Sequence, residues 1–163
     1  MRVLGIDPGS RFTGYGVIEK QGNQLLHIAS GRIVAGTSKD PLPERLAKIH
    51  EGLTEVIREH APTGAALEGI FHARNAMSSL KLGHARGVAM LTVQLHDLTL
   101  HEYPPASVKQ AVTGSGRATK DTVAHMVKML LGKQGMKMTE DESDALAVAI
   151  CHCNTINFIR RLQ

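Results

Sequence analysis

The chain has 163 residues, of which 42% are hydrophobic and 21% are charged, and its formal net charge is +4 at pH 7. This balance excludes a disordered or fibrous chain, and the length is that of one domain able to bury a sizeable core. The longest stretch without charged residues, 145–159, is too short to span a bilayer, and no signal peptide is expected at the N-terminus. We therefore expect one soluble, cytoplasmic domain over residues 1–163, with no membrane partner.

Positive charge is concentrated in the middle of the chain. Positions 69–138 carry nine Lys and Arg residues against three acidic ones, whereas the rest carries ten basic and twelve acidic residues. A basic middle region indicates a polyanionic partner for one face, although a solvated Lys/Arg surface explains the charge alone equally well. Because the chain has only two Tyr, three Phe and no Trp, a stacking platform for single-stranded nucleic acid is not expected.

The first half of the chain predicts three strands, a helix and a fourth strand. Short apolar or alternating runs over 3–6, 13–18 and 24–35 are separated by turns, which predicts an antiparallel meander. Asp40 is the candidate N-cap of a helix whose apolar stripe runs from Leu46 to Ile57. The fourth strand, 65–67, leads into Glu68.

The second half alternates helices with one more strand. A helical pattern over about 75–95 carries Gly83 and Gly87 four residues apart on one face, where another backbone can approach closely. The remaining elements are expected at 98–102 (a strand), 105–112 and 119–131 (helices), and from 139 onward (a last helix). Thr139 and Glu142 fit a capping box at the start of that helix. The order β-β-β-α-β-α-β-α-α-α predicts an α/β domain.

Four carboxylates stand at the ends of buried elements. Asp7 and Glu68 each end an apolar strand, and Asp141 and Asp144 lie three apart on one face of a mostly apolar helix. If the two strands are neighbours, the four groups converge at one end of the sheet. Four negative charges together require a cation, and hard oxygen ligands suit Mg²⁺ or Mn²⁺. Taken singly, each acid has an ordinary alternative as a turn residue, a solvent-facing strand end or a favourable charge at a helix N-terminus.

Several motifs occur in a fixed order along the chain. In one-letter code they are LGIDPGSRFTGYG at 4–16, LEGIF at 67–71, LKLGHARG at 80–87, VKQ at 108–110 and DESDALA at 141–147. The tripeptide Arg74-Asn75-Ala76 and the single residue Lys120 complete the set. This set resembles the RuvC family of Holliday junction resolvases over nearly the whole chain. The resemblance implies an RNase H-like fold, with a five-stranded mixed sheet flanked by helices on both faces. It also implies an endodeoxyribonuclease that acts as a homodimer in DNA recombination and repair, with a four-way DNA junction and branch-migration motor proteins as partners.

The same resemblance implies a set of catalytic residues. Metal binding is assigned to Asp7, Glu68, Asp141 and Asp144, with two Mg²⁺ or Mn²⁺ ions per active site. One metal lowers the pKa of the attacking water and the other stabilises the leaving 3′ oxygen, which leaves 5′-phosphate and 3′-hydroxyl ends on two symmetrically nicked strands. Lys109 and Lys120 are expected to add positive charge at the reacting phosphate.

DNA contacts are implied for a further set of residues, namely Phe71, Arg74, Asn75, Lys81, Lys109, Arg117 and Lys120. Phe71 is expected on a loop as a wedge that holds the junction open. The glycine-rich segment 114–117 next to Lys120 also predicts an anion site made of backbone N–H groups and a helix start. Gly69 departs from the family, which often has a polar residue there, and His72 receives no role.

Other readings stay open on the sequence. Actin-like ATPases share the strand-Asp-x-Gly turn, but they need two such domains to enclose a nucleotide. A related family of RNase H-like nucleases acts on ribosomal RNA precursors, and the Glu68-x-x-Phe71 spacing favours the resolvase over it. A non-catalytic junction-binding protein is the third reading, and the four intact acids argue against it. Cys151 and Cys153 are expected to pack as small buried hydrophobes rather than to bind metal.

Overall fold

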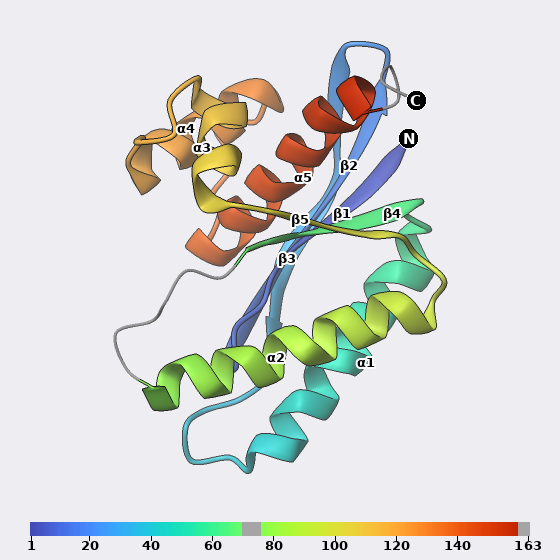
Figure 1. The fold of residues 1–163 in the computed structure, drawn as a ribbon, viewed down its shortest axis with the longest axis vertical. Helices are drawn as coiled ribbons and strands as arrows, with labels where there is room; N and C mark the ends of the chain where they lie inside the picture. Colours follow the sequence, from blue (N-terminus) through green and yellow to red (C-terminus); the bar gives the residue numbers. More distant parts are fainter. Residues whose placement is uncertain (70–75, 160–163) are drawn as a thin grey trace.

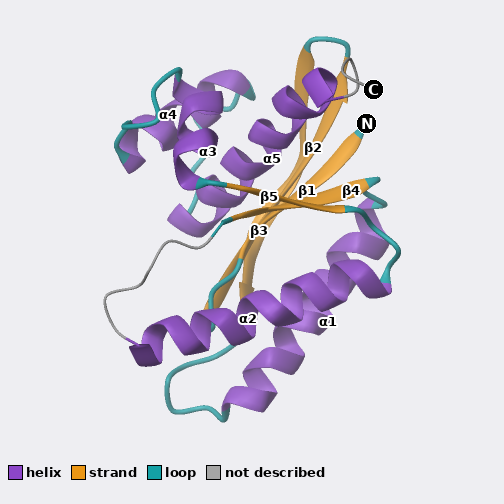
Figure 2. Cartoon of the chain, viewed as in Figure 1, coloured by secondary structure: helices purple, strands orange, loops and turns teal. Residues whose placement is uncertain are grey.

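A five-stranded mixed sheet separates two helical layers in the computed structural model, which describes residues 1–69 and 76–159 (Figure 1; Figure 2). The strands, in chain order, are β1 (Arg2–Asp7), β2 (Phe12–Gln21), β3 (Gln24–Val34), β4 (Gly64–Glu68) and β5 (Leu100–Tyr103). Their spatial order is β3-β2-β1-β4-β5, and β1, β2 and β3 form the predicted antiparallel meander. β4 runs parallel to β1 and β5 runs parallel to β4, so the sheet is mixed, as the resemblance implied.

The helices cover both faces of the sheet (Figure 1). They are α1 (Leu42–His60), α2 (Ala76–Leu95), α3 (Pro105–Thr113), α4 (Lys120–Leu130) and α5 (Glu140–Ile159). α1 and α2 lie on one face, whereas α5 lies on the other with α3 and α4 beside it (Figure 2). Within the described residues, no helix is both long and apolar enough to cross a membrane.

Alternation along the strands divides the core in two. On β1, Leu4 and Ile6 pack with apolar residues of α1 and α2, whereas Val3 packs with α3, α4 and α5. Successive side chains of a strand point to opposite faces, so odd-numbered positions of β1 face α5. Asp7 therefore leaves the sheet on the α5 side.

Glycines on this face let α5 lie directly on the sheet. A Cβ atom on Gly5 would lie 2.0 Å from the carbonyl oxygen of Ala145, and one on Gly16 would lie 2.6 Å from Cδ2 of Leu146. Neither space admits a side chain. Since α5 carries two of the predicted site acids, these glycines fix how close those acids come to the strand ends.

The start of α1 differs from the prediction. Its N-cap residue is Pro41, and Oδ2 of Asp40 instead accepts hydrogen bonds from the backbone N and from Oγ1 of Thr37, at 2.6 and 2.9 Å. Asp40 as an N-cap was therefore wrong, because its carboxylate closes the preceding turn and proline starts the helix. The capping box of α5 is confirmed, since the Thr139 backbone N donates to Glu142 Oε2 at 2.9 Å and the Glu142 backbone N donates to Thr139 Oγ1 at 3.3 Å.

The apolar pattern of α2 is split between core and surface. Ala85, Ala89 and Val93 are buried against the sheet and α1. Leu91 and Leu95 are 57% and 63% exposed, although both fit the helical pattern in the sequence. The helix thus has a second apolar side that this chain does not cover.

Candidate active site

Asp7 and Glu68 end neighbouring parallel strands. Ile6 of β1 and Leu67 of β4 are register partners, and both side chains belong to the core under α1 and α2. The next residue on each strand points to the opposite face, so the Asp7 and Glu68 carboxylates leave the sheet side by side under α5. The adjacency expected from the two strand ends is present.

α5 brings the other two acids to the same place. A Cβ atom on Gly14 of β2 would lie 2.0 Å from the carbonyl oxygen of Asp141, which places the first turn of α5 against the sheet. Asp144 follows one turn later and lines a pocket together with Glu68. Asp141 also forms an ion pair with Arg32 of β3, with Nη1 and Oδ2 3.6 Å apart.

Mutual repulsion shows that these groups form one electrostatic unit, called the four acids from here on (Asp7, Glu68, Asp141 and Asp144). Burial, followed by the negative charges of Asp144, Asp141 and Glu68, raises the pKa of the Asp7 carboxyl from 3.8 to about 7. Burial, followed by the nearby Asp144 charge, raises the pKa of Glu68, and burial also raises that of Asp144. A group of acids that resists ionisation in this way is stabilised by an added positive charge.

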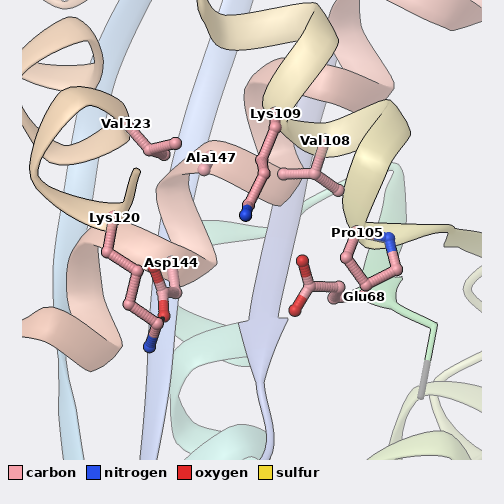
Figure 3. Close-up of a pocket in the computed structure, with 8 residues that line it drawn as sticks. All are labelled: Glu68, Pro105, Val108, Lys109, Lys120, Val123, Asp144 and Ala147. Carbon is pink, nitrogen blue, oxygen red and sulfur yellow. Dashed lines mark hydrogen bonds and ion pairs between the residues drawn. The ribbon is translucent and has the colours of Figure 1, made fainter. Parts of the chain in front are cut away.

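Two lysines from other helices face the four acids. Lys120 is the first residue of α4, and its Nζ donates to Glu140 Oε1 and, at 3.4 Å, to Asp144 Oδ2. The hydrogen bond to Glu140 raises the pKa of Lys120 above its usual range, so the side chain stays charged. Lys109 of α3 points toward the space in front of Glu68 (Figure 3).

These groups line a pocket of about 220 Å³. Charged groups of Glu68, Asp144, Lys109 and Lys120 project into it, and apolar side chains such as Val108 and Val123 complete its wall (Figure 3). A second space of about 220 Å³ continues on the other side of Glu68, where Asp7, Leu82 and Arg86 line it. Glu68 thus lies between two accessible hollows, with Asp144 in one and Asp7 in the other.

By donor type the four acids fit a hard divalent cation, since every donor is a carboxylate oxygen. In the described residues, however, no three His, Cys, Asp or Glu side chains are placed closely enough to enclose an ion. Burial, followed by mutual repulsion, raises the pKa values of Asp7 and Glu68, and both effects favour an added cation. The arrangement is a set of convergent acids rather than a closed metal cage.

Comparison with known proteins identifies the family. Residues 3–152 match the family described as "Crossover junction endodeoxyribonuclease RuvC". The chain belongs to the RuvC family. The Syntrophotalea carbinolica RuvC is 56% identical over 154 residues, covering 94% of both chains, and that of Citrifermentans bemidjiense is 52% identical over 155 residues, covering 95% of this chain and 93% of the relative.

The solved structures agree. A Thermus thermophilus RuvC in complex with Holliday junction substrate has a TM-score of 0.91 and 31% sequence identity, and the match covers 97% of this chain and 96% of that one. The RNase H-like fold and the enzyme class, a crossover junction endodeoxyribonuclease, are thereby confirmed. RuvC nucleases depend on divalent metal, which agrees with the donor chemistry of the four acids.

Arg86 is a site residue that the sequence reasoning missed, although it lies within one of the RuvC motifs. Its side chain is 9% exposed, Nη1 donates to the carbonyl oxygen of Glu68 at 2.5 Å, and Nη2 pairs with Oε2 of Glu102. Arg86 therefore ties α2 to the ends of β4 and β5, and its charge adds to those of Lys120 and Lys109 in partly offsetting the burial that raises the pKa of Glu68. The available signal was an arginine among small residues on the core side of a helix, because a buried guanidinium requires partners.

The anion site predicted at 114–117 is wrong for its backbone donors. The N–H groups of Ser115, Gly116 and Arg117 already donate to side-chain oxygens of Thr113, Gln110 and Ser115, at 3.1, 3.0 and 3.4 Å. Local side chains satisfy the loop, since Ser, Thr and Gln compete well for nearby amides. What remains is the exposed side chain of Arg117.

The other RuvC positions singled out by sequence have different outcomes. Phe71, His72, Arg74 and Asn75 lie outside the described residues. Gly69 donates its N–H to the Tyr103 carbonyl oxygen at 2.7 Å, and a Cβ there would lie 3.3 Å from that same oxygen, so the glycine suits a tight extension of the β4–β5 pairing. Cys151 and Cys153 are buried, as expected.

Proposed function

We propose that this chain resolves Holliday junctions by nicking two opposed strands symmetrically, with Mg²⁺ or Mn²⁺ held by the four acids. The observation that carries the proposal is the convergence of the four acids on one face at the end of the sheet, where burial, together with the charges of the other three, raises the pKa of Asp7 to about 7. The similar Thermus thermophilus protein, solved with a Holliday junction substrate, supports the choice of DNA.

Two divalent ions, when bound, would supply an activated water and stabilise the leaving 3′ oxygen, giving 5′-phosphate and 3′-hydroxyl ends. The chain's own residues have separate tasks. Glu140 and Asp144 hold the Lys120 ammonium beside the acids, so that it can meet a phosphate oxygen without a large rearrangement. Lys109 approaches the same space from α3, and its charge partly offsets the burial that raises the pKa of Glu68. Arg86 fixes the backbone from which the Glu68 carboxylate projects.

The uncovered side of α2 supports a homodimer. Four large apolar residues on it are between 54% and 63% exposed, namely Met77, Leu80, Leu91 and Leu95. Gly83 and Gly87 lie along the same side, and a Cβ on either would meet no atom of the described residues within 4 Å. A two-fold axis along this side would give one active site to each of the two equivalent strands of a junction.

DNA contacts complete the proposal. Lys81, Lys109, Arg117 and Lys120 would bind backbone phosphates, and Arg74 and Asn75 would do so from the segment before α2. Phe71 would act as a wedge, so that Phe71→Ala keeps its melting temperature and junction affinity but cuts slowly. On the family resemblance, the proposal also includes branch-migration motor proteins as partners and a cytoplasmic location.

The test is cleavage of a synthetic four-way junction beside a linear duplex and a ribosomal RNA precursor, each with Mg²⁺ and with Mn²⁺. We expect paired nicks at symmetric positions in the junction only, and products that a DNA ligase reseals directly. Cleavage of the RNA precursor with an intact junction would instead favour the related RNA nuclease. Tight junction binding without any cleavage, under either metal, would favour a structural binding protein.

A further inference from the structure

A basic pocket lies next to the acid cluster, on the α1–α2 side of the molecule. Its volume is about 310 Å³, and its polar lining consists of Ser10, Arg11, Ser38, Arg45, Ser78 and Lys81. Leu82 lines both this pocket and the hollow beside Asp7 and Glu68. The two spaces therefore adjoin, with Leu82 as their common wall.

The lining has the chemistry of an anion site. Three of its side chains are cationic and three are hydroxyls, and among the described residues that line it none is acidic. Guanidinium groups and serine hydroxyls together offer many donors to an oxyanion, and the planar guanidinium suits phosphate in particular. The nearby Asp40 carboxylate already accepts from Thr37.

Arg45 is the second, independent observation. It is only 3% exposed, and its Nη1 donates to the carbonyl oxygen of Ser10 at 2.7 Å. Its buried Nε has no hydrogen-bond partner in the part of the chain that the structure describes, and none of the ion pairs found there involves Arg45. The carboxylate of Asp40 is close enough for Arg45 to help lower its pKa, after the hydrogen bonds from Thr37, but it forms no ion pair with Arg45. A buried guanidinium without a paired carboxylate is costly, and an anion in the pocket would reduce that cost.

The position of Arg45 relates the pocket to the active site. Its bond to Ser10 anchors the first turn of α1 on the turn that follows β1, three residues after Asp7. Arg11 follows on the same turn, and Lys81 reaches the pocket from α2. Arg11 thus lies on the same short segment that carries one of the four acids, and Arg45 is hydrogen-bonded to that segment.

We propose that this pocket binds a backbone phosphate of the DNA strand being cut, a few nucleotides from the scissile phosphate. The inference rests on the proposed function and deepens it. A strand whose scissile phosphate lies over the four acids would pass Leu82 and enter the pocket, where Arg11, Arg45 and Lys81 meet the next accessible phosphate. Two fixed phosphates would set the register of the strand over the metal site, since backbone contacts position a nucleic acid.

The experiment removes charge from either side of the contact. Junction binding is measured with the cleavage-deficient Asp7→Asn protein, which also carries Arg11→Ala or Lys81→Ala, and with junctions that have one neutral methylphosphonate at successive positions near the cut. We expect each alanine to weaken binding about tenfold and to lower the slope of log K against log salt by about one. One methylphosphonate position should weaken binding to Asp7→Asn alone by a similar factor and have no further effect on the Arg11→Ala protein.

Arg58→Ala is the matched control, because Arg58 is an exposed base on α1 that does not line the pocket. It should change affinity less than twofold and keep full sensitivity to the methylphosphonate. Two results would overturn the inference. The first is that the loss of affinity from Arg11→Ala adds to the loss from the methylphosphonate at every position, and the second is that Arg11→Ala weakens binding no more than Arg58→Ala does.

A further arm distinguishes DNA from free phosphate. Inorganic phosphate, exchanged for chloride at constant ionic strength, should compete with the junction more strongly on the protein with Arg11 intact than on the Arg11→Ala protein. If phosphate competes in this way but no methylphosphonate position couples to Arg11, the pocket takes a free anion and its assignment to DNA is wrong. Cleavage by the unaltered chain is run in parallel, and a chain that neither binds nor cuts junctions contradicts the proposed function itself.

Discussion

Gly14 of β2 lies directly against the backbone of Asp141 on α5, with only 2.0 Å between the position of an added Cβ and the Asp141 carbonyl oxygen. Gly14 is the register partner of Asp7, so the contact joins the end of the sheet to the first turn of the helix that carries two of the four acids. Backbone cannot move aside as the end of a flexible side chain can. The distance between the strand acids and the helix acids is therefore set by a missing side chain.

Gly14→Ala should displace α5 and separate the four acids. We expect the free energy of unfolding to fall by about 1–3 kcal/mol, as for other overpacked cores, and junction cleavage to fall further than stability alone explains. Urea denaturation and single-turnover cleavage measure the two effects. Gly135→Ala is the control, because nothing lies within 4 Å of its added Cβ. A Gly14→Ala protein with normal stability and cleavage would show that this contact does not position the acids.

The ends of the strands that carry Asp7 and Glu68 could be predicted from the sequence, because buried strands consist of apolar residues and a carboxylate directly after such a run marks its end. Alternation then places Asp7 and Glu68 on one face, provided that their strands are neighbours, which the parallel pairing of β1 with β4 supplies. The metal and DNA roles of the site residues remain predictions. Gly14 and Gly16 also stand in the alternating run 13–18, but that alternation predicts a strand and not the close approach of a helix.

Other contacts could not be read because they join elements far apart in sequence. Lys120 meets Glu140 only through the packing of α4 against α5, and Arg86 meets Glu102 only because β5 lies beside β4. The prediction of Asp40 as an N-cap was wrong for a local reason. An aspartate side chain can accept from the start of a helix or from a nearby turn, and here it accepts from Thr37 in the turn. Leu91 shows a further limit, because helical spacing alone does not reveal which apolar side is covered.

Replacing any one of the four acids by its amide should abolish cleavage while junction binding persists (Asp7→Asn, Glu68→Gln, Asp141→Asn or Asp144→Asn). Each change removes one ligand charge and leaves the basic surface intact, so metal chemistry is lost and phosphate binding is kept. Cleavage and gel-shift assays on the same junction separate the two. If one of these variants keeps near-normal cleavage in saturating Mg²⁺ and Mn²⁺, the acid that was replaced is not a metal ligand.

The metal-free protein should become less stable as pH rises, because of Asp7. Its pKa is about 7 in the folded state against 3.8 ordinarily, so below about pH 4 the group is protonated in both states and has no effect. Between about pH 4 and 7 the unfolded chain loses the proton that the folded chain keeps, and the free energy of unfolding falls. Glu68 and Asp144 shift in the same direction.

One pKa unit corresponds to about 1.4 kcal/mol, so Asp7 accounts for at most about 4 kcal/mol of this loss. Asp7→Asn removes the effect, and the variant should exceed the original chain in stability at about pH 8 but not at about pH 4. Urea midpoints in EDTA measure the difference, and adding Mg²⁺ should narrow it. An equal difference at both pH values would contradict the raised pKa.

Lys120→Ala should slow cleavage at least about tenfold with a smaller effect on junction affinity, because its charge is placed at the reacting phosphate. Lys120→Arg keeps the charge but not the compact ammonium, and should recover only part of the rate. Lys133→Ala is the matched control, because Lys133 is an exposed base just after α4 that lines neither of the pockets that contain Lys120 and Asp144. Equal rates for Lys120→Ala and Lys133→Ala would mean that Lys120 acts only as general surface charge.

The uncovered side of α2 should hold two chains together. Apolar residues there are more than half exposed, and side chains of that size on one helix face rarely remain in water when a second copy is present. Leu91→Glu puts a charge in the centre of the proposed contact and should raise the dimer dissociation constant at least about tenfold, as loss of a central contact does. Because Leu91 is exposed within the chain, the monomer's own stability should change little. Met129→Glu on α4, where the native side chain is 47% exposed, is the control and should leave the dimer intact.

Sedimentation velocity measures the association of the two chains, and cleavage of a junction labelled on both cut strands measures its effect on paired nicking. The Leu91→Glu protein should lose paired nicking before it loses single nicks, since each active site stays complete within one chain. A native chain that sediments as a monomer at the concentration where it nicks both strands would contradict the dimer.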